Sequence, residues 1–158
     1  MDFNKRLERA IDRGQRTRDA AGQAKAQQAM NEEEQRNIHS KLRLELSDHI
    51  EDCLRKLADH FPGFEFSASA GGASITRDDV DISRQRRTRS LYSRLEMVIS
   101  AYSTAAPIIE MTSKGTIRNK ETQNRNHYQF LADTDVEAFG ELIDLWVLEF
   151  AEQFASHQ

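Results

Sequence analysis

Several features that would narrow the function of this chain are missing from its 158 residues. Its single cysteine, Cys53, excludes a disulfide within the chain and any metal site built from cysteines alone. No apolar run approaches the roughly 18 residues that a membrane-spanning helix requires. The opening residues, MDFNKRLERAIDRG, lack the apolar core of a secretory signal. We therefore expect an uncleaved N-terminus, a reducing cytoplasmic environment and no membrane partner.

Motifs for familiar chemistry are also missing. Neither the G-x-S-x-G turn of serine hydrolases nor the G-x-x-x-x-G-K-[ST] phosphate loop occurs. Asp78, Asp79 and Asp81 are expected to face the arginines of SRQRRTR across a hairpin, as solvated pairs worth about 0–1 kcal/mol each. We therefore nominate no catalytic residue and no cofactor, and we favour a non-enzymatic role.

The N-terminal part of the chain is predicted to be helical in two pieces. Residues 1–30 form a polar helical arm of high helix propensity. From Asn31, which precedes three glutamates as an N-cap would, large apolar residues recur at helical spacing. This amphipathic helix is expected to end at Pro62-Gly63. Its apolar stripe comprises Ile38, Leu42, Leu46, Ile50, Cys53, Leu57 and Phe61.

The middle of the chain alternates apolar and polar residues, which is typical of strands in a sheet covered on one face. Leu91, Leu95, Met97 and Ile99 are expected to point towards the core. The predicted features are a strand at 64–70, a turn at Gly71-Gly72, a bulge near Asp78-Asp79, a strand at 89–103, a fourth strand starting at Ile109, a turn within 119–126 and a short strand at 127–131.

A second amphipathic helix ends the chain. Asp133 or Thr134 is expected to cap it, and one apolar stripe runs from Val136 to Phe154. We therefore predict an α+β fold: an N-terminal helical arm (1–30) and a single domain (31–158). The domain consists of an amphipathic helix, an antiparallel β-meander of four to five strands, and a C-terminal amphipathic helix packed on the same sheet face.

Charge is segregated along the chain although the net charge is only −4. Residues 84–125 carry nine basic and three acidic side chains, whereas residues 126–158 carry seven acids and no lysine or arginine. Such asymmetry bears on binding partners rather than on the fold.

The final helix also carries Leu145 and Leu148 on the side opposite its main stripe, among acids. The arm carries a short apolar stripe among basic residues, which complements them. The leading hypothesis is therefore a non-catalytic protein–protein interaction or assembly module, most simply self-associating, with the arm docked within one chain or between two. The residues assigned to this surface are Phe3, Leu7, Arg9, Ile11, Arg13, Glu141, Asp144, Leu145 and Leu148.

The alternative hypothesis is single-stranded nucleic-acid binding by a basic, tyrosine-bearing open face of the sheet, where bases stack on rings and phosphates meet cations. The isoelectric point of about 5.8 and the lack of an RNP-like aromatic motif argue against it. The residues assigned to this face are Tyr92, Arg94, Tyr102, Lys114, Arg118, Arg125 and Tyr128.

Glu45, His49 and Cys53 recur every four residues, so they project from one side of the first amphipathic helix. Each is a possible zinc ligand, and His127 could complete the set. The simpler interpretation places Cys53 in the apolar stripe and the other two at its wet edge. Structural zinc sites usually bring two or more cysteines, so we assign no metal.

Overall fold

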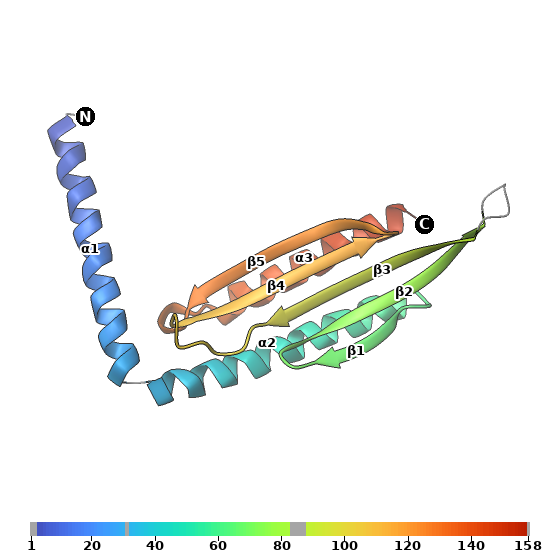
Figure 1. Cartoon of the computed structure of the whole chain (residues 1–158), viewed down its shortest axis with the longest axis horizontal. Coiled ribbons are helices and arrows are strands. Elements are labelled where there is room, and N and C mark those ends of the chain that lie inside the picture. Colours follow the sequence, from blue (N-terminus) through green and yellow to red (C-terminus); the bar gives the residue numbers. More distant parts are fainter. Residues whose placement is uncertain (1–2, 31, 83–87, 158) are drawn as a thin grey trace.

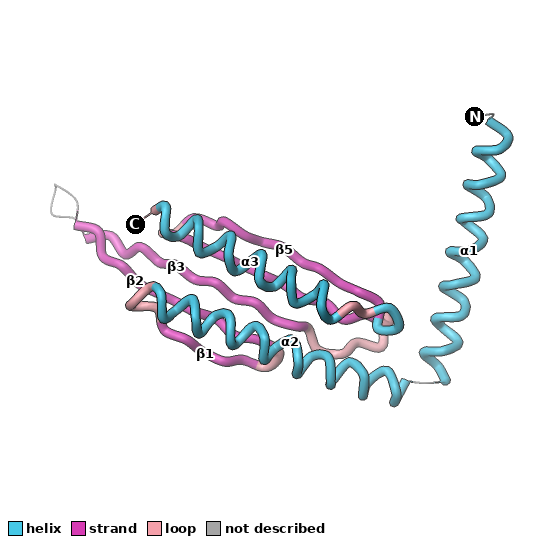
Figure 2. The backbone as a smooth tube through the Cα atoms, turned by 180° about the vertical axis from the view of Figure 1, so that it is seen from behind, coloured by secondary structure: helices cyan, strands magenta, loops and turns pink. Residues whose placement is uncertain are grey.

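The computed structural model describes residues 3–30, 32–82 and 88–157, and its architecture is α+β. An antiparallel sheet of five strands, in the order β1-β2-β3-β4-β5, forms one layer. Helices α2 and α3 lie side by side on one face of that sheet (Figures 1 and 2). The elements are α1 (Phe3–Met30), α2 (Glu32–His60), β1 (Glu65–Ser69), β2 (Gly72–Ile82), β3 (Thr88–Ile99), β4 (Ile108–Ile117), β5 (Lys120–Phe130), a 3-10 turn (Leu131–Asp133) and α3 (Val136–Ser156). The predicted fold class is confirmed, including the packing of both helices on the same sheet face.

Helix α2 follows the predicted apolar stripe except at Ile38, which is 40% exposed, and the predicted N-cap, Asn31, lies outside the described residues. Three glutamates occupy its first turn, where carboxylates interact favourably with the unpaired backbone amides. Leu46, Ile50, Leu54 and Leu57 are buried against the sheet. The helix ends just before the Pro62-Gly63 turn, where Gly63 takes the left-handed conformation (φ 104°) that glycine adopts without strain.

Strands β2, β3 and β4 present their odd-numbered residues to the helices. Leu91, Leu95, Met97 and Ile99 are buried as predicted, and Ala73 and Ile75 of β2 lie opposite Met97 and Leu95. The first turn is Ala70-Gly71 rather than Gly71-Gly72, because Ser69 pairs directly with Gly72. The third strand ends at Ile99, short of the predicted residue 103.

The bulge predicted near Asp78-Asp79 is absent, since β2 and β3 stay in one unbroken register from Gly72–Val98 to Ile82–Thr88. This hairpin extends beyond the helices (Figure 1). Val80, an even-numbered residue of β2, therefore lies exposed on the open face, and no bulge is needed to turn it towards the core. The sequence SRQRRTR falls mostly on residues 83–87, outside the described residues. Arg89, the last arginine of that sequence, is described and lies opposite Asp81 in the β2–β3 register, in line with the prediction. Asp79 instead pairs with Arg77 of its own strand, with Nε donating to Oδ1 at 2.9 Å.

The last hairpin differs most from the prediction. Its turn is Arg118-Asn119, both with positive φ (49° and 71°), and not a point further along within 119–126. Strand β5 is therefore an eleven-residue edge strand instead of a short one at 127–131. Gln123, buried in this strand, accepts from Ser113 Oγ at 2.8 Å and donates to the Trp146 carbonyl at 2.9 Å. A buried polar triad therefore ties β4, β5 and α3 together.

Helix α3 buries the predicted stripe, and its N-cap is Asp135. The Asp135 carboxylate accepts from the Ala138 amide at 3.0 Å. Asp133 and Thr134, the predicted caps, lie in and just after the preceding 3-10 turn. The buried residues of the helix are Phe139, Ile143, Trp146, Val147, Phe150 and Phe154.

Helix α1 projects away from the sheet (Figures 1 and 2). Side chains 3–21 are all exposed. None of the described helices is long and apolar enough to cross a membrane.

His39 of α2 is a buried titratable group, with 2% of its surface exposed and its ring 5.5 Å from that of Tyr102. Burial, followed by the nearby Arg43 charge, lowers the pKa of His39. Below about pH 6.5 the unfolded chain takes up a proton at this residue more readily than the folded chain. The free energy of unfolding therefore decreases as the pH is lowered. We expect His39→Phe to reduce that loss. Urea-unfolding midpoints of both proteins at pH 7.5 and pH 5.5 would test this; an identical pH dependence would contradict it.

Candidate functional site

The outer side of α3 combines exposed leucines with acids. Leu145 and Leu148 point away from the sheet, with Leu148 65% exposed. The helix carries no lysine or arginine. Its five acids are Glu137, Glu141, Asp144, Glu149 and Glu152.

The arm, α1, carries charge of the sign opposite to that of α3. Phe3, Leu7 and Ile11 form an exposed stripe, four residues apart, along α1. Between residues 3 and 21 the helix has six basic and three acidic side chains. In both views α1 and α3 stand well apart, so the docking within one chain is not made in this structure. Docking between two chains stays a prediction.

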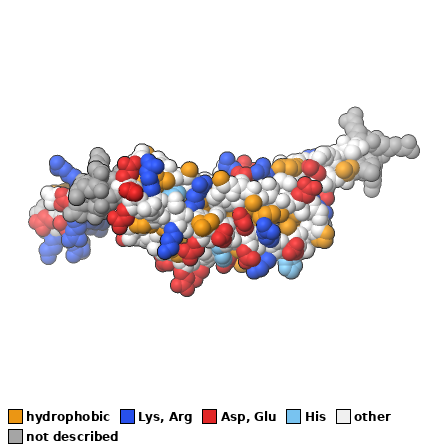
Figure 3. Space-filling view, turned by 90° about the horizontal axis from the view of Figure 1, so that it is seen from below, with side chains coloured by type: hydrophobic (Ala, Val, Ile, Leu, Met, Phe, Trp, Pro, Cys, Tyr) orange, Lys and Arg blue, Asp and Glu red, His pale blue; other side chains and the backbone are white. Residues whose placement is uncertain are grey.

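The open face of the sheet is less basic than predicted. Tyr92, Arg94, Lys114 and Tyr128 do share it, because the strand register places them on the side away from the helices. Arg94 is already paired with Glu96. The described acids on this face are Glu65, Asp78, Glu96, Glu110 and Glu121, against the two bases Arg94 and Lys114. Figure 3 views the molecule from below, not onto the open face, and the surface that it shows also carries charges of both signs intermixed with hydrophobic side chains.

The other three residues assigned to that face lie elsewhere. Tyr102 falls beyond the end of β3 and packs its ring against His39 of α2. Arg125 lies on the helix-covered side of β5, where it pairs with Glu149 and lies 5.9 Å from the Trp146 ring centre. The structure therefore does not bring the seven predicted residues together.

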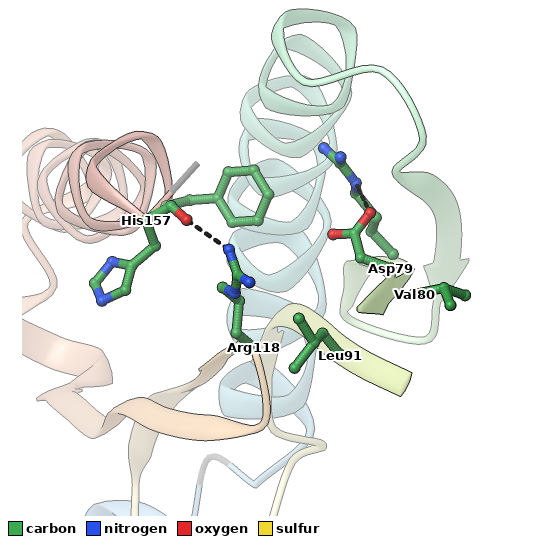
Figure 4. Close-up of a pocket in the computed structure, with 7 residues that line it drawn as sticks. Asp79, Val80, Leu91, Arg118 and His157 are labelled. Carbon is green, nitrogen blue, oxygen red and sulfur yellow. Dashed lines mark hydrogen bonds and ion pairs between the residues drawn. The ribbon is translucent and has the colours of Figure 1, made fainter. Parts of the chain in front are cut away.

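Arg118 lies at the end of the sheet, in an open pocket shown in Figure 4. Its Nη1 donates to the carbonyl of His157 at 2.8 Å, at the C-terminus of α3, where a cation is favourable. The other guanidinium of the pocket, that of Arg77, is paired with Asp79. Among the described residues that line the pocket, both guanidiniums thus have partners in the protein, and neither is free to bind an anionic ligand.

A cluster of three ligand-type side chains joins α2 to α3. His49 Nε2 is 2.8 Å from Asp144 Oδ1, and the Cys53 thiol donates to the same oxygen at 3.3 Å. Cys53 Sγ lies 3.8 Å from His49 Nε2. Burial, and then the hydrogen bond to Asp144, raises the pKa of the Cys53 thiol to about 12.

This cluster differs from the predicted one in its third member. Among the described residues, the group whose donor atoms converge is His49, Cys53 and Asp144, without Glu45. His127 packs against Phe139 at 5.0 Å between ring centres and contacts Gln129 instead. Helical spacing identified the pair on α2, whereas Asp144 is 91 residues beyond Cys53 and meets it only through the packing of α3 on α2.

Comparisons with known protein families, with curated proteins and with solved structures found no match. The functional proposals below therefore rest on the geometry of the chain itself.

Proposed function

We propose that this chain is a self-associating assembly module, in which α1 of one copy docks on the outer side of α3 of a second copy. The observation that supports it most strongly is the match between two exposed apolar stripes with flanks of opposite charge. Phe3 is 72% exposed and Leu148 65% exposed, so both stripes present apolar surface to water. Burying such surface drives association.

The spacing of the stripes suits helix-on-helix packing. Leu145 and Leu148 are three residues apart, and Phe3, Leu7 and Ile11 are four apart, so each set forms a ridge on one side of its helix. Arg9, two residues from both Leu7 and Ile11, lies on the other side of α1, and Asp144 already contacts His49 and Cys53 of its own chain. Arg13, which borders the stripe of the arm, would face Glu141 on α3. These flanking charges would select the orientation and accelerate encounter rather than supply most of the affinity.

A contact between copies suits the direction of the arm. Since α1 points away from its own α3 (Figure 2), it is placed to reach a neighbour. If two copies exchange arms, each contact is made twice about a two-fold axis, which closes the assembly at a dimer.

Light scattering on the full-length chain tests this proposal. We expect the mass of two chains for the unmodified protein, and of one chain after Leu148→Glu or Leu7→Glu, because each places a carboxylate in the apolar contact. Leu44→Glu is the matched control: Leu44 is 64% exposed on α2, outside the proposed contact, and its replacement should leave the dimer intact. A monomeric unmodified protein, or equal dissociation by Leu44→Glu, would contradict the proposal.

Charge reversal refines the same test. Arg13→Glu should weaken the dimer, and adding Glu141→Arg to it should restore part of the affinity if the two side chains meet. Dissociation constants measured for both single variants and the double variant would give the coupling directly. Simple addition of the two effects would rule out the pairing of Arg13 with Glu141.

A further inference from the structure

The polar cluster between α2 and α3 has the composition of a metal-binding site. His49 and Cys53 are one helical turn apart on α2, and Asp144 approaches them from α3. An imidazole nitrogen, a thiol sulfur and a carboxylate oxygen thus meet within 4.8 Å of one another. Two rigid helices, rather than a loop, hold the three groups.

The surroundings give the cluster one dry side and one wet side. Cys53 is partly buried and packs against the hydrophobic core. The side chains of His49 and Asp144 are 38% and 50% exposed. An ion can therefore enter from solvent while the sulfur is held in place by the core.

The separations resemble those that a tetrahedral ion imposes. Zinc bound at about 2.3 Å to sulfur and about 2.0–2.2 Å to nitrogen and oxygen keeps its ligand atoms roughly 3.4–3.6 Å apart. The sulfur-to-nitrogen and sulfur-to-oxygen distances here are 3.8 and 3.3 Å. Only the nitrogen-to-oxygen distance, 2.8 Å, must open, by about 0.6 Å to reach that range. Rotation of the Asp144 carboxyl about its side-chain bonds can supply that change.

We propose that His49 Nε2, Cys53 Sγ and the Asp144 carboxylate bind one zinc ion, with water in the fourth position. The soft sulfur donor favours zinc over magnesium or calcium, which prefer oxygen ligands alone. Three protein ligands and an exchangeable fourth position form the pattern of zinc sites that activate water or accept an external ligand. The competing interpretation is a plain polar contact, in which Asp144 accepts hydrogen bonds from the thiol and the imidazole and no ion binds.

Cobalt(II) distinguishes the two interpretations in the full-length chain, because it adopts the geometry of zinc and absorbs light. After treatment with a chelator, addition of cobalt should produce a thiolate-to-cobalt charge-transfer band that saturates at one ion per chain, and zinc should remove it. Cys53 is the only thiol, so the band can be assigned without any substitution.

Variants then locate the other ligands. Cys53→Ser should abolish the band, and His49→Ala should weaken zinc binding by about 10–100-fold or more, the range seen even for loss of an outer partner of a ligand. His60→Ala is the matched control: His60 lies on the same helix, roughly 16 Å along its axis, and its loss should change nothing. His49→Ala also tests the zinc site independently of the proposed dimer contact. Asp144 is assigned to both, whereas His49 is assigned to the zinc site alone.

The proposal is overturned if cobalt does not bind to the unmodified protein. It is also overturned if cobalt binds without producing the thiolate band, since surface histidines alone would then hold the ion. Equal zinc affinity of the unmodified protein and His49→Ala would overturn it as well. Circular dichroism of each variant guards against misfolding, and the spectrum of the unmodified protein decides the matter should a variant fail to fold.

Discussion

Gly72→Ala is expected to destabilise the domain by about 3 kcal/mol or more, at the upper end of what overpacking costs. A Cβ at Gly72 would lie 2.0 Å from the Met97 carbonyl oxygen and 2.8 Å from the Val98 Cα. Both are backbone atoms of β3, the central strand, so they cannot move aside without breaking the β2–β3 pairing. Because a domain of this size is stable by only about 5–15 kcal/mol, the loss should be plain in a urea titration followed by circular dichroism.

Gly14→Ala is the matched control for this substitution. Gly14 lies in the exposed arm, and a Cβ there would meet no atom within 4 Å. Removing a glycine from a helix interior should stabilise the arm by up to about 1 kcal/mol and leave the sheet unchanged. If the two substitutions had similar effects, the close approach of β2 to β3 at Gly72 would be wrong.

The contrast between predicted and observed strands shows what the sequence can reveal about this fold. The core side of β3 could be predicted because Leu91, Leu95, Met97 and Ile99 alternate with polar residues, and burial of one sheet face imposes that period. Strand β5 could not, because its only fully buried side chain is a glutamine. Gln123 looks like a surface residue until Ser113 and Trp146 are seen to satisfy both ends of its amide.

Errors at the turns have a related cause. The Arg118-Asn119 turn takes two positive φ angles without a glycine, which is an uncommon pattern for residues with side chains. Asn119 gains from its position, since its side chain accepts from the Tyr92 amide at 2.8 Å and donates to the Ser90 carbonyl at 2.9 Å. These contacts reach a strand 27 and 29 residues earlier, so local sequence carries little sign of them.

The candidate site was predictable only within single helices. Periodicity identified the His49–Cys53 pair on α2, and the outward position of Leu145 and Leu148 on α3, because both follow from 3.6 residues per turn. Asp144 and Cys53 are 91 residues apart, and their contact depends on how α2 and α3 pack beside each other on the sheet. Likewise, Arg125 was assigned to the wrong side because of a register shift between Gly115 and Thr116. The turn at Arg118-Asn119 alone would pair Arg125 with Thr112 on the open face, whereas the shift places it opposite Ser113, on the side of the helices.

The second large expected effect concerns Phe150 and Leu148, two apolar residues of α3 that point in opposite directions, one into the core and one towards solvent. Phe150 is fully buried, with its ring stacked on that of Phe154 at 6.2 Å and edge-on to Phe64 at 6.5 Å. Phe150→Ala should cost about 3–5 kcal/mol, from lost burial and the cavity left between α3 and the sheet. Leu148→Ala, two residues earlier on the exposed side, should change the stability of a single chain by no more than about 0.5 kcal/mol.

The comparison requires single chains, because Leu148 also lies in the proposed dimer contact. Both alanine substitutions are therefore best made in the Leu7→Glu protein, where the arm should no longer dock, and the unfolding midpoint should be independent of protein concentration. In that background the loss at Phe150 should exceed the loss at Leu148 several-fold. Comparable losses would mean that α3 is rotated about its axis, which would move Leu148 into the core and remove the exposed stripe on which the assembly proposal depends.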